Sequence, residues 1–304
     1  MAIVSYVDNN SLLGQCYVEH AYYKLRTRVL EEINSLTYYL EEEGNIYGYV
    51  ISTNVSLSSI YQFPCYVVKF VFSAIDTFHR ESQEQLLGRL CLHLYSFMQT
   101  HRGYYNLRIP THIVDLLKAV NHHLEHLIFC GGTVDEIYIG GFDVPPLREG
   151  IEVFFADFAF AMENRNSMIQ LAYDSFKKYQ GQYHISPVTE ERAGEIYSRW
   201  IQGSFDNFRA DSILVGQYHG KIVGFGLIEE NNIAVDFVLS CVSDRVRGLG
   251  VYKAIGSSLV RYAASRNKLF VSSTQLDNFI SQGTWASLGM RPFCSIYNFH
   301  YDNR

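Results

Sequence analysis

The sequence predicts an α/β fold, an α+β arrangement with a mixed sheet, built from two halves of similar order. Short β-branched and aromatic runs alternate with helical patterns along most of the chain. Glycines and prolines gather at residues 140–150 and divide the chain near its middle. The composition is globular, because 48% of the 304 residues are hydrophobic and 18% are charged. That much apolar material can fill two cores of ordinary size.

Each element of the first half follows from local composition or from hydrophobic spacing. Valines and phenylalanines after Cys65 favour a strand, and leucines three and four residues apart from Leu86 onward favour a helix. The expected order is a hairpin over 37–52 that turns at Glu43–Asn45, a strand over 65–73, a helix over 81–99, a strand over 104–110, a helix from 113 to 124, and short strands over 127–132 and 135–141.

The second half shows the same order of strands and helices without a repeat of residues. Pro187 stands just before a helical pattern, as prolines do at helix starts, and His219–Lys221 form the turn of a hairpin. The expected order is a strand over 151–161, helices over 167–179 and 188–202, a hairpin of 212–218 with 221–230, a strand over 233–242, a loop over 243–250, a helix over 251–266, a strand over 268–274, a helix over 277–289 and two short closing strands.

Charge and cysteine content argue against several classes of protein. The 25 basic and 31 acidic residues give a net charge of −6, whereas nucleic acids attract a positive field. No apolar run reaches the ~18 residues of a membrane helix, and the N-terminus lacks a signal-peptide pattern. The six cysteines stand singly, without a C-x-x-C pair, so we expect reduced core thiols in a cytoplasmic protein.

The loop over 243–250, between a strand and a helix, is the segment that carries chemistry. Gly248 and Gly250 let the backbone bend tightly and approach a ligand without a Cβ in the way. The loop opens onto a helix N-terminus, where free N–H groups favour a phosphate, and Arg245 and Arg247 add positive charge. Neither the Walker nor the Rossmann glycine pattern is present. These residues alone leave open a glycine-rich turn without a ligand.

The loop resembles the cofactor loop of the GCN5-related N-acetyltransferases (GNAT), whose pattern is V-x-x-x-x-[QR]-G-x-G-x-[GA]. This chain places Val242, Arg247, Gly248 and Gly250 in register and has Tyr252 where the family has a small residue. Three further residues follow at the family's spacing: Asn278, Trp285 and Gly289. The resemblance covers residues 151–304.

The resemblance implies acetyl-CoA (coenzyme A) as cofactor and tandem GNAT-like lobes with a mixed, mostly antiparallel sheet, flanking helices and splayed central strands. It implies that the following residues bind the cofactor: Cys241, Val242, Arg247, Gly248, Leu249, Gly250, Val251, Tyr252 and Asn278.

Within the family, four stretches resemble the dTDP-fucosamine acetyltransferases: 196–206, 222–226 with Glu230, 247–250 and 274–278. This resemblance implies a degenerate GNAT-like domain over 1–141, a linker over 142–150 and a catalytic domain over 151–304. In the first of these, 74–86 stands where the phosphate loop would be and lacks a glycine pair. The implied acceptor is the primary amine of a nucleotide-linked amino deoxysugar, with no nucleic acid or membrane partner and a homodimer left open.

Three residues are expected to act in catalysis. An alkyl amine is only about one part in 10³ neutral at pH 7, so a base is useful, and the resemblance assigns Glu230 to that role. Asp236, in the middle of a strand, is either an acceptor-site group or a solvent-facing residue. Many family members have Tyr at the position of Trp285, where its hydroxyl acts as the general acid. An indole can donate a hydrogen bond but cannot release its proton. Water or a nearby Tyr would therefore supply the proton to the departing thiolate.

Other functions are left open by the sequence. The acceptor could be an amino acid, a polyamine or a peptide, and the lobe could bind CoA as a non-enzymatic sensor. His122 and His126 lie one helical turn apart but have no third ligand at matching spacing, so no metal site is expected. His300 either faces the acceptor pocket or has a structural role.

Overall fold

The computed structural model describes residues 36–42, 45–72, 80–111, 113–138, 146–179, 181–206, 210–231 and 234–304. They form two compact units. The first combines the described residues up to Thr133 with Cys294–Arg304, and the second runs from Val134 to Phe293. The chain therefore returns to the first unit for its last strand. Residues 142–145 of the predicted linker, and the predicted loop position 74–79, lie outside the described residues.

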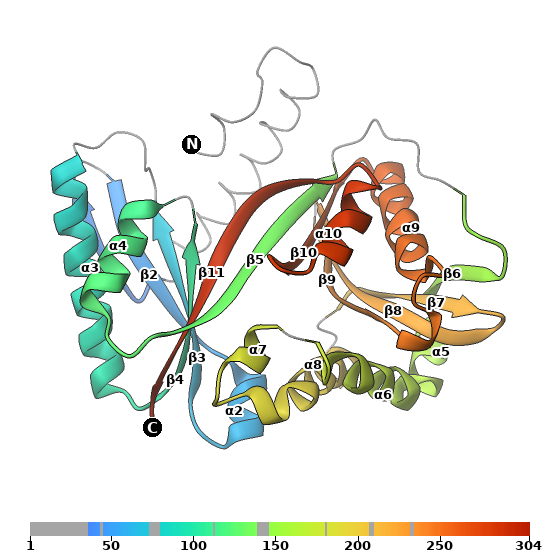
Figure 1. The fold of residues 1–304 in the computed structure, drawn as a ribbon, viewed down its shortest axis with the longest axis horizontal. Coiled ribbons are helices and arrows are strands. Elements are labelled where there is room, and N and C mark those ends of the chain that lie inside the picture. The colour runs from blue at the N-terminus through green and yellow to red at the C-terminus, as the bar shows by residue number, and fades with distance from the viewer. Residues whose placement is uncertain are drawn as a thin grey trace, which may run out of the picture. The chain divides into compact units, whose positions relative to one another are not determined.

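The first unit orders its strands β1-β2-β3-β4-β11 and packs two long helices on one face (Figure 1). The strands pair antiparallel except β3 with β4, which are parallel. The elements are β1 (Tyr38–Glu42), β2 (Asn45–Thr53), α2 (Val55–Tyr61), β3 (Cys65–Phe72), α3 (Arg80–Thr100), β4 (Gly103–Pro110), α4 (Val114–His123), β5 (Ile128–Tyr138) and β11 (Arg291–Asn303). The end of β5, from Val134, and the start of β11, up to Phe293, belong to the second unit.

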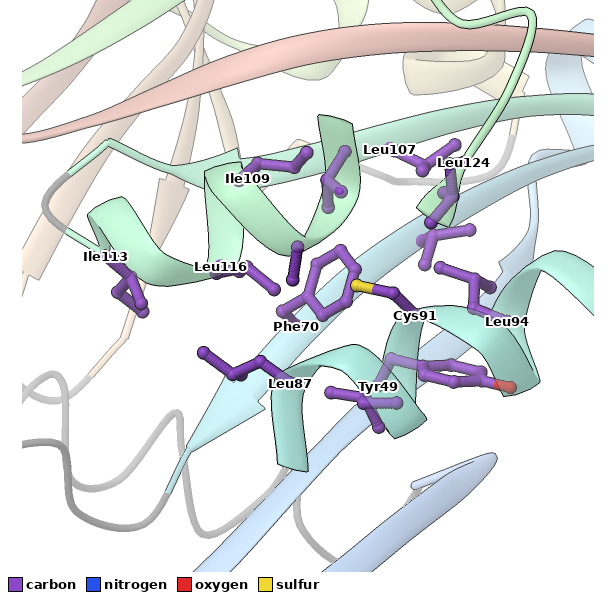
Figure 2. Close-up of a cluster of buried hydrophobic side chains, with 14 of the residues drawn as sticks. Tyr49, Phe70, Leu87, Cys91, Leu94, Leu107, Ile109, Ile113, Leu116 and Leu124 are labelled. Carbon is purple, nitrogen blue, oxygen red and sulfur yellow. The ribbon is translucent and has the colours of Figure 1, made fainter. Parts of the chain in front are cut away.

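The core of this unit forms where the predicted leucine stripe of α3 meets the sheet. Figure 2 shows Cys91 and Leu94 of α3 close to Phe70 of β3 and Tyr49 of β2, with Leu116 of α4 opposite. Every second residue of β4 faces these helices, as a strand's alternation requires. The first hairpin pairs Glu42 with Asn45, and residues 43–44 of the predicted turn lie outside the described residues.

The second unit orders its strands β10-β9-β8-β7-β6, with α9 on one face and α6 with α8 on the other (Figure 1). Among the pairings of β6 to β10, only that of β9 with β10 is parallel. The elements are β6 (Ile151–Ala156), α5 (Phe158–Glu163), α6 (Arg165–Phe176), α7 (Gln182–Ile185), α8 (Ala193–Asp206), β7 (Ser212–Tyr218), β8 (Lys221–Glu230), β9 (Ala234–Val242), α9 (Val251–Ser265), β10 (Leu269–Gln275) and α10 (Phe279–Ala286).

The predicted mixed α/β fold is confirmed, but three predicted elements are wrong. The strand expected over 151–161 ends at Ala156, because Asp157 caps a helix by accepting a hydrogen bond from the Phe160 N–H. The two short strands expected over 127–141 form one strand, β5, in which Gly131 takes a positive φ of 81°. The two closing strands are also one, β11. The short helices α2, α5 and α7 were not predicted.

The closest packing in the second unit is at two glycines. A Cβ on Gly226 of β8 would lie 1.8 Å from the Phe237 ring, and one on Gly256 of α9 would lie 2.6 Å from Trp285. Phe237 and Trp285 meet edge to face with ring centroids 5.8 Å apart. Both large rings therefore fit only because the facing residues have no side chain.

A matched pair of helix glycines tests this packing. Gly256→Ala places a methyl against Trp285 and Leu288, whereas nothing lies within 4 Å of a Cβ on the exposed Gly283 of α10. Both changes gain about 1 kcal/mol of helix propensity, but only the first overpacks the core, at about 1–3 kcal/mol. Urea unfolding should show Gly283→Ala to be the more stable variant by about 2 kcal/mol; equal stability would contradict the packing.

Candidate functional site

A gap opens in the sheet of the second unit between β9 and β10. The two strands pair from Ala234–Leu269 only as far as Phe237–Ser272, although β9 continues to Val242 and β10 to Gln275. The pairing of β9 with β8 also shifts there, and Val238 has no partner opposite it. Val238 is thus a β-bulge, which bends the strand and changes which face its later side chains point to. The predicted splay of the central strands is confirmed.

The glycine loop lies at the end of the same strand. Gly248 and Gly250 have φ angles of 77° and 89°, and nothing lies within 4 Å of a Cβ at either position. Gly250 is the N-cap of the 15-residue helix α9 and offers no side chain to its first N–H groups. Arg247 is exposed and pairs with Asp244 at 2.7 Å. The loop is an open cradle at a helix N-terminus, a geometry that favours a phosphate.

A set of polar side chains, here called the polar cluster, lies where β9 and β10 diverge. It consists of Tyr179, Ser240, Tyr252, Thr274, Asn278 and Ser281. The amide of Asn278 donates to Thr274 at 2.9 Å, to Ser281 at 2.8 Å and to the Tyr179 hydroxyl at 3.3 Å. The Tyr252 hydroxyl contacts Ser240 and Ser281, and burial raises its pKa to about 12. Tyr252 is therefore a neutral hydroxyl inside the splay.

Trp285 is fully buried beside the polar cluster. Its ring packs on Phe237, on Phe270 at 5.8 Å and on Tyr252 at 5.0 Å between centroids. Its indole N–H has no hydrogen-bond partner among the described residues. The ring supports Tyr252, and its predicted hydrogen bond to a leaving group stays a prediction.

Glu230 is not brought together with the loop. It pairs with Val235 at the start of β9, roughly 23 Å along the strand from Val242. Its carboxylate accepts hydrogen bonds from Lys268 at 2.5 Å and from Tyr262 at 2.8 Å. The Lys268 ammonium, more than any other neighbour, holds the pKa of Glu230 below its usual value of 4.5. A carboxylate with these partners is suited to fixing the ends of α9 and β10, and its role as a general base stays a prediction.

Asp236 lies closer to the gap. It stands two residues before the bulge, inside the last paired stretch of β9 and β10. Its side chain is half-buried and lies directly opposite Glu229 of β8, which is exposed. Cross-strand neighbours share a face of the sheet, so two carboxylates meet here.

The other residues predicted to bind the cofactor lie on different faces of the sheet in the second unit. Val242, Leu249 and Val251 pack into or against the core beneath α9. Cys241 points to the opposite face, where its thiol contacts Ser175 and burial raises its pKa to about 12. Only its main chain could serve a cofactor. Asn278, besides its role in the polar cluster, caps α10.

Glu136 of β5 was missed in the sequence. It is 4% exposed, and burial raises its pKa from 4.5 to about 7. An acid within the apolar run Val134–Tyr138 was the available signal.

The histidines that the sequence singled out lie in the first unit. His123 ends α4, and His126 lies beyond it with a positive φ of 61°. Within the part of the chain that the structure describes, no group of three or more potential ligands could hold a metal ion. His300 is buried in the first unit, hydrogen-bonded to the Tyr104 hydroxyl, and burial lowers its pKa to about 3.

None of the helices described is long and apolar enough to cross a membrane.

Comparison with known proteins identifies the fold. No family model matches the sequence, and no curated protein does. A GCN5-related N-acetyltransferase from Sphaerobacter thermophilus is 12% identical, with 91% of this chain and 85% of that one covered and a TM-score of 0.57. One from Kribbella flavida is 10% identical, with 92% and 95% covered and a TM-score of 0.53.

A third solved structure bears on the two-lobed prediction. A tandem GNAT protein from the clavulanic acid biosynthesis pathway is 9% identical, with 87% of this chain and 81% of that one covered and a TM-score of 0.50. The chain therefore has the fold of the GCN5-related N-acetyltransferases, as the loop residues indicated. The tandem relative agrees with the predicted arrangement of lobes.

The partners of Glu230 lead to a prediction about stability. A carboxyl whose pKa is lowered by folding stabilises the protein above its unfolded pKa, and this stability is lost as pH falls through the folded pKa. Glu230→Gln should therefore lower the unfolding free energy at pH 7 by about 1 kcal/mol, allowing for solvent screening, and by less as pH falls below 4.5.

The control is Glu152→Gln, at an exposed carboxylate of β6, which should leave stability within about 0.5 kcal/mol. Melting temperatures measured from pH 3 to 8 give both values. A loss of turnover in Glu230→Gln with an unchanged melting temperature would restore the role of general base.

Proposed function

We propose that this protein is an acetyl-CoA-dependent N-acetyltransferase that acts on a primary amine. The observation that carries the proposal is that one strand, β9, joins both halves of the required site. It leaves β10 at Phe237 to open a gap, and it ends at the glycine loop that begins α9. A long thioester cofactor needs both a channel for its arm and a cradle for its phosphates. The GNAT fold of the chain supports the same conclusion.

The residues present fit acetyl-CoA. The left-handed φ angles and open surroundings of Gly248 and Gly250 expose the first N–H groups of α9, which would hold the pyrophosphate with Arg245 and Arg247 nearby. The edge of β9 from Val238 to Val242 is not paired with β10, so its main chain can hold the pantetheine arm. The cofactor, when bound, supplies the acetyl group as a thioester.

Three sets of groups then perform the chemistry. Asp236, which stands two residues before the bulge in β9, accepts the proton of the amine. A main-chain N–H on the unpaired edge of β9 polarises the carbonyl. The Tyr252 hydroxyl, buried in the polar cluster, gives a proton to the departing thiol in place of the Tyr that many family members have at position 285.

The acceptor we favour is the amino group of a nucleotide-linked amino deoxysugar. This choice rests on the sequence resemblance around 196–206 and 274–278. Amino acids, polyamines and peptides are the other amines to compare, and a CoA sensor without activity is the non-enzymatic alternative. The degenerate first lobe is part of the same proposal and predicts one CoA site per chain.

The function is tested by acetyl transfer to a panel of amines. Thiol release from acetyl-CoA is measured with an amino-sugar nucleotide, a free amino sugar, spermidine and glycine, and products are checked by mass spectrometry. We expect transfer to the first at the highest kcat/KM. Tight CoA binding with no transfer to any amine would favour the sensor.

A glycine pair tests the cofactor loop. Gly250→Val should weaken acetyl-CoA binding at least ~10-fold in calorimetry, because a β-branched residue at φ 89° distorts the cradle and obstructs the phosphates. Gly220→Val in the β7–β8 turn has the same open surroundings and a φ of 74°, so it shares the backbone strain but lies outside the site. It should bind normally. Equal binding by both variants, or two sites per chain, would contradict the proposal.

A further inference from the structure

Two cations and an amide stand side by side on the sheet of the first unit. Lys69 of β3 is the register partner of Arg108 of β4, and Arg108 is the partner of Asn298 of β11. Val68, Leu107 and Phe299, each one residue away from one of the three, pack into the core beneath α3 and α4. Alternation along the strands therefore places Lys69, Arg108 and Asn298 together on the opposite face. We call these three residues the cation row.

Two members of the cation row lack the partners that their burial calls for. Arg108 is half-buried but has no hydrogen bond or ion pair with any residue that the structure describes. Asn298 is 1% exposed, and its amide nitrogen has no hydrogen-bond partner among the described residues. Buried arginines are almost always paired, and an unsatisfied buried donor costs free energy. Both side chains therefore have N–H groups available to a ligand.

The strands that carry the cation row place no acid next to it. The same-face residues two positions along each strand are Val67 and Val71 on β3, Asn106 and Pro110 on β4, and Ile296 and His300 on β11. A ligand at the row would therefore meet two positive charges and no negative one from these neighbours.

The sheet parts directly beyond the cation row. β3 and β4 pair in parallel as far as Lys69 and Arg108, and no pair follows, although β3 runs to Phe72 and β4 to Pro110. The parallel pair of the second unit, β9 with β10, parts in the same way. Lys69 and Arg108 thus form the last pair before the two strands separate, so a ligand beside them need not displace a pair of the sheet.

We propose that the cation row binds the phosphoryl group of a small molecule. The Arg108 guanidinium offers a planar fork of N–H donors, the Lys69 ammonium a compact charge, and the Asn298 amide a neutral N–H donor. A phosphoryl group carries up to three terminal oxygens and two negative charges, which match three donors and two cations. A carboxylate, with two oxygens and one charge, would leave a donor unsatisfied. The site lies within the first unit and does not depend on acetyl transfer.

Unfolding of the full chain in denaturant tests the site, with inorganic phosphate as the probe. A ligand that binds only the folded state lowers the unfolding equilibrium constant, by roughly tenfold at a concentration ten times its dissociation constant. Arg108→Gln removes a charged donor and should weaken phosphate binding at least ~10-fold. Asn298→Asp places a carboxylate beside Arg108. It should pair with the guanidinium, abolish binding of phosphate, and leave the chain at least as stable as wild type in phosphate-free buffer.

Two control variants separate the cation row from other effects of phosphate. Arg89→Gln removes an exposed arginine of α3 and should respond as wild type does, including any general stabilisation by phosphate as a salt. Gly250→Val alters the glycine loop and should keep the part of the response that Arg108→Gln loses. Equal responses of Arg108→Gln and Arg89→Gln, or a response lost only in Gly250→Val, would overturn the proposal.

Thymidine diphosphate and succinate, measured in the same way, define the class of ligand. Tighter binding of the diphosphate than of inorganic phosphate, lost in Arg108→Gln, would support a phosphate ester as the ligand. Equal binding of the two, lost in the same variant, would support the phosphate ion. Succinate that binds as tightly as phosphate would overturn the assignment of a phosphoryl group.

Discussion

The second unit depends on how far β9 can pair with its neighbours. It pairs with β8 along its length but with β10 over only four residues, because the bulge at Val238 turns the strand away. A regular strand would have closed the sheet and left no unpaired edge. The bulge also separates side chains by face: Phe237 points into the core beneath α9, and Cys241, four residues on, points to the face covered by α6. The extra residue at the bulge, Val238, thus opens the gap and determines which side chains of β9 face each side of the sheet.

Packing beside the gap fixes the rings that lie next to it. Trp285 and Tyr252 lie against each other with ring centroids 5.0 Å apart, and Gly226 and Gly256 leave room for the rings of Phe237 and Trp285. The Tyr252 hydroxyl contacts Ser240, on the stretch of β9 that is not paired with β10. The unpaired edge of β9 therefore has a hydroxyl beside it.

Sequence reasoning found the features that local patterns encode. Gly248 and Gly250 could be placed because a tight turn before a helix needs positive φ, and the stripe on α9 because its period is helical. Glu230 was singled out by resemblance. Where its strand end lies relative to the gap depends on the register of β8 with β9, and a one-residue bulge shifts that register. Glu136 was missed because its burial depends on strands that lie more than a hundred residues away along the chain. The break at Ala156 was missed although Asp157 is an ordinary helix cap.

The departure at Tyr252 is the most informative difference from the family pattern. A small residue at that point of the first turn leaves room near the glycine loop, whereas a tyrosine must send its ring elsewhere. Here the ring lies against Trp285 and the hydroxyl reaches Ser240 and Ser281, so the bulk is accommodated inside the splay and the loop itself stays open. The family pattern has a small residue on the helix that corresponds to α9 and, in many members, a tyrosine on the one that corresponds to α10, whereas this chain has a tyrosine on α9 and a tryptophan on α10. The buried hydroxyl at this point of the fold therefore comes from α9.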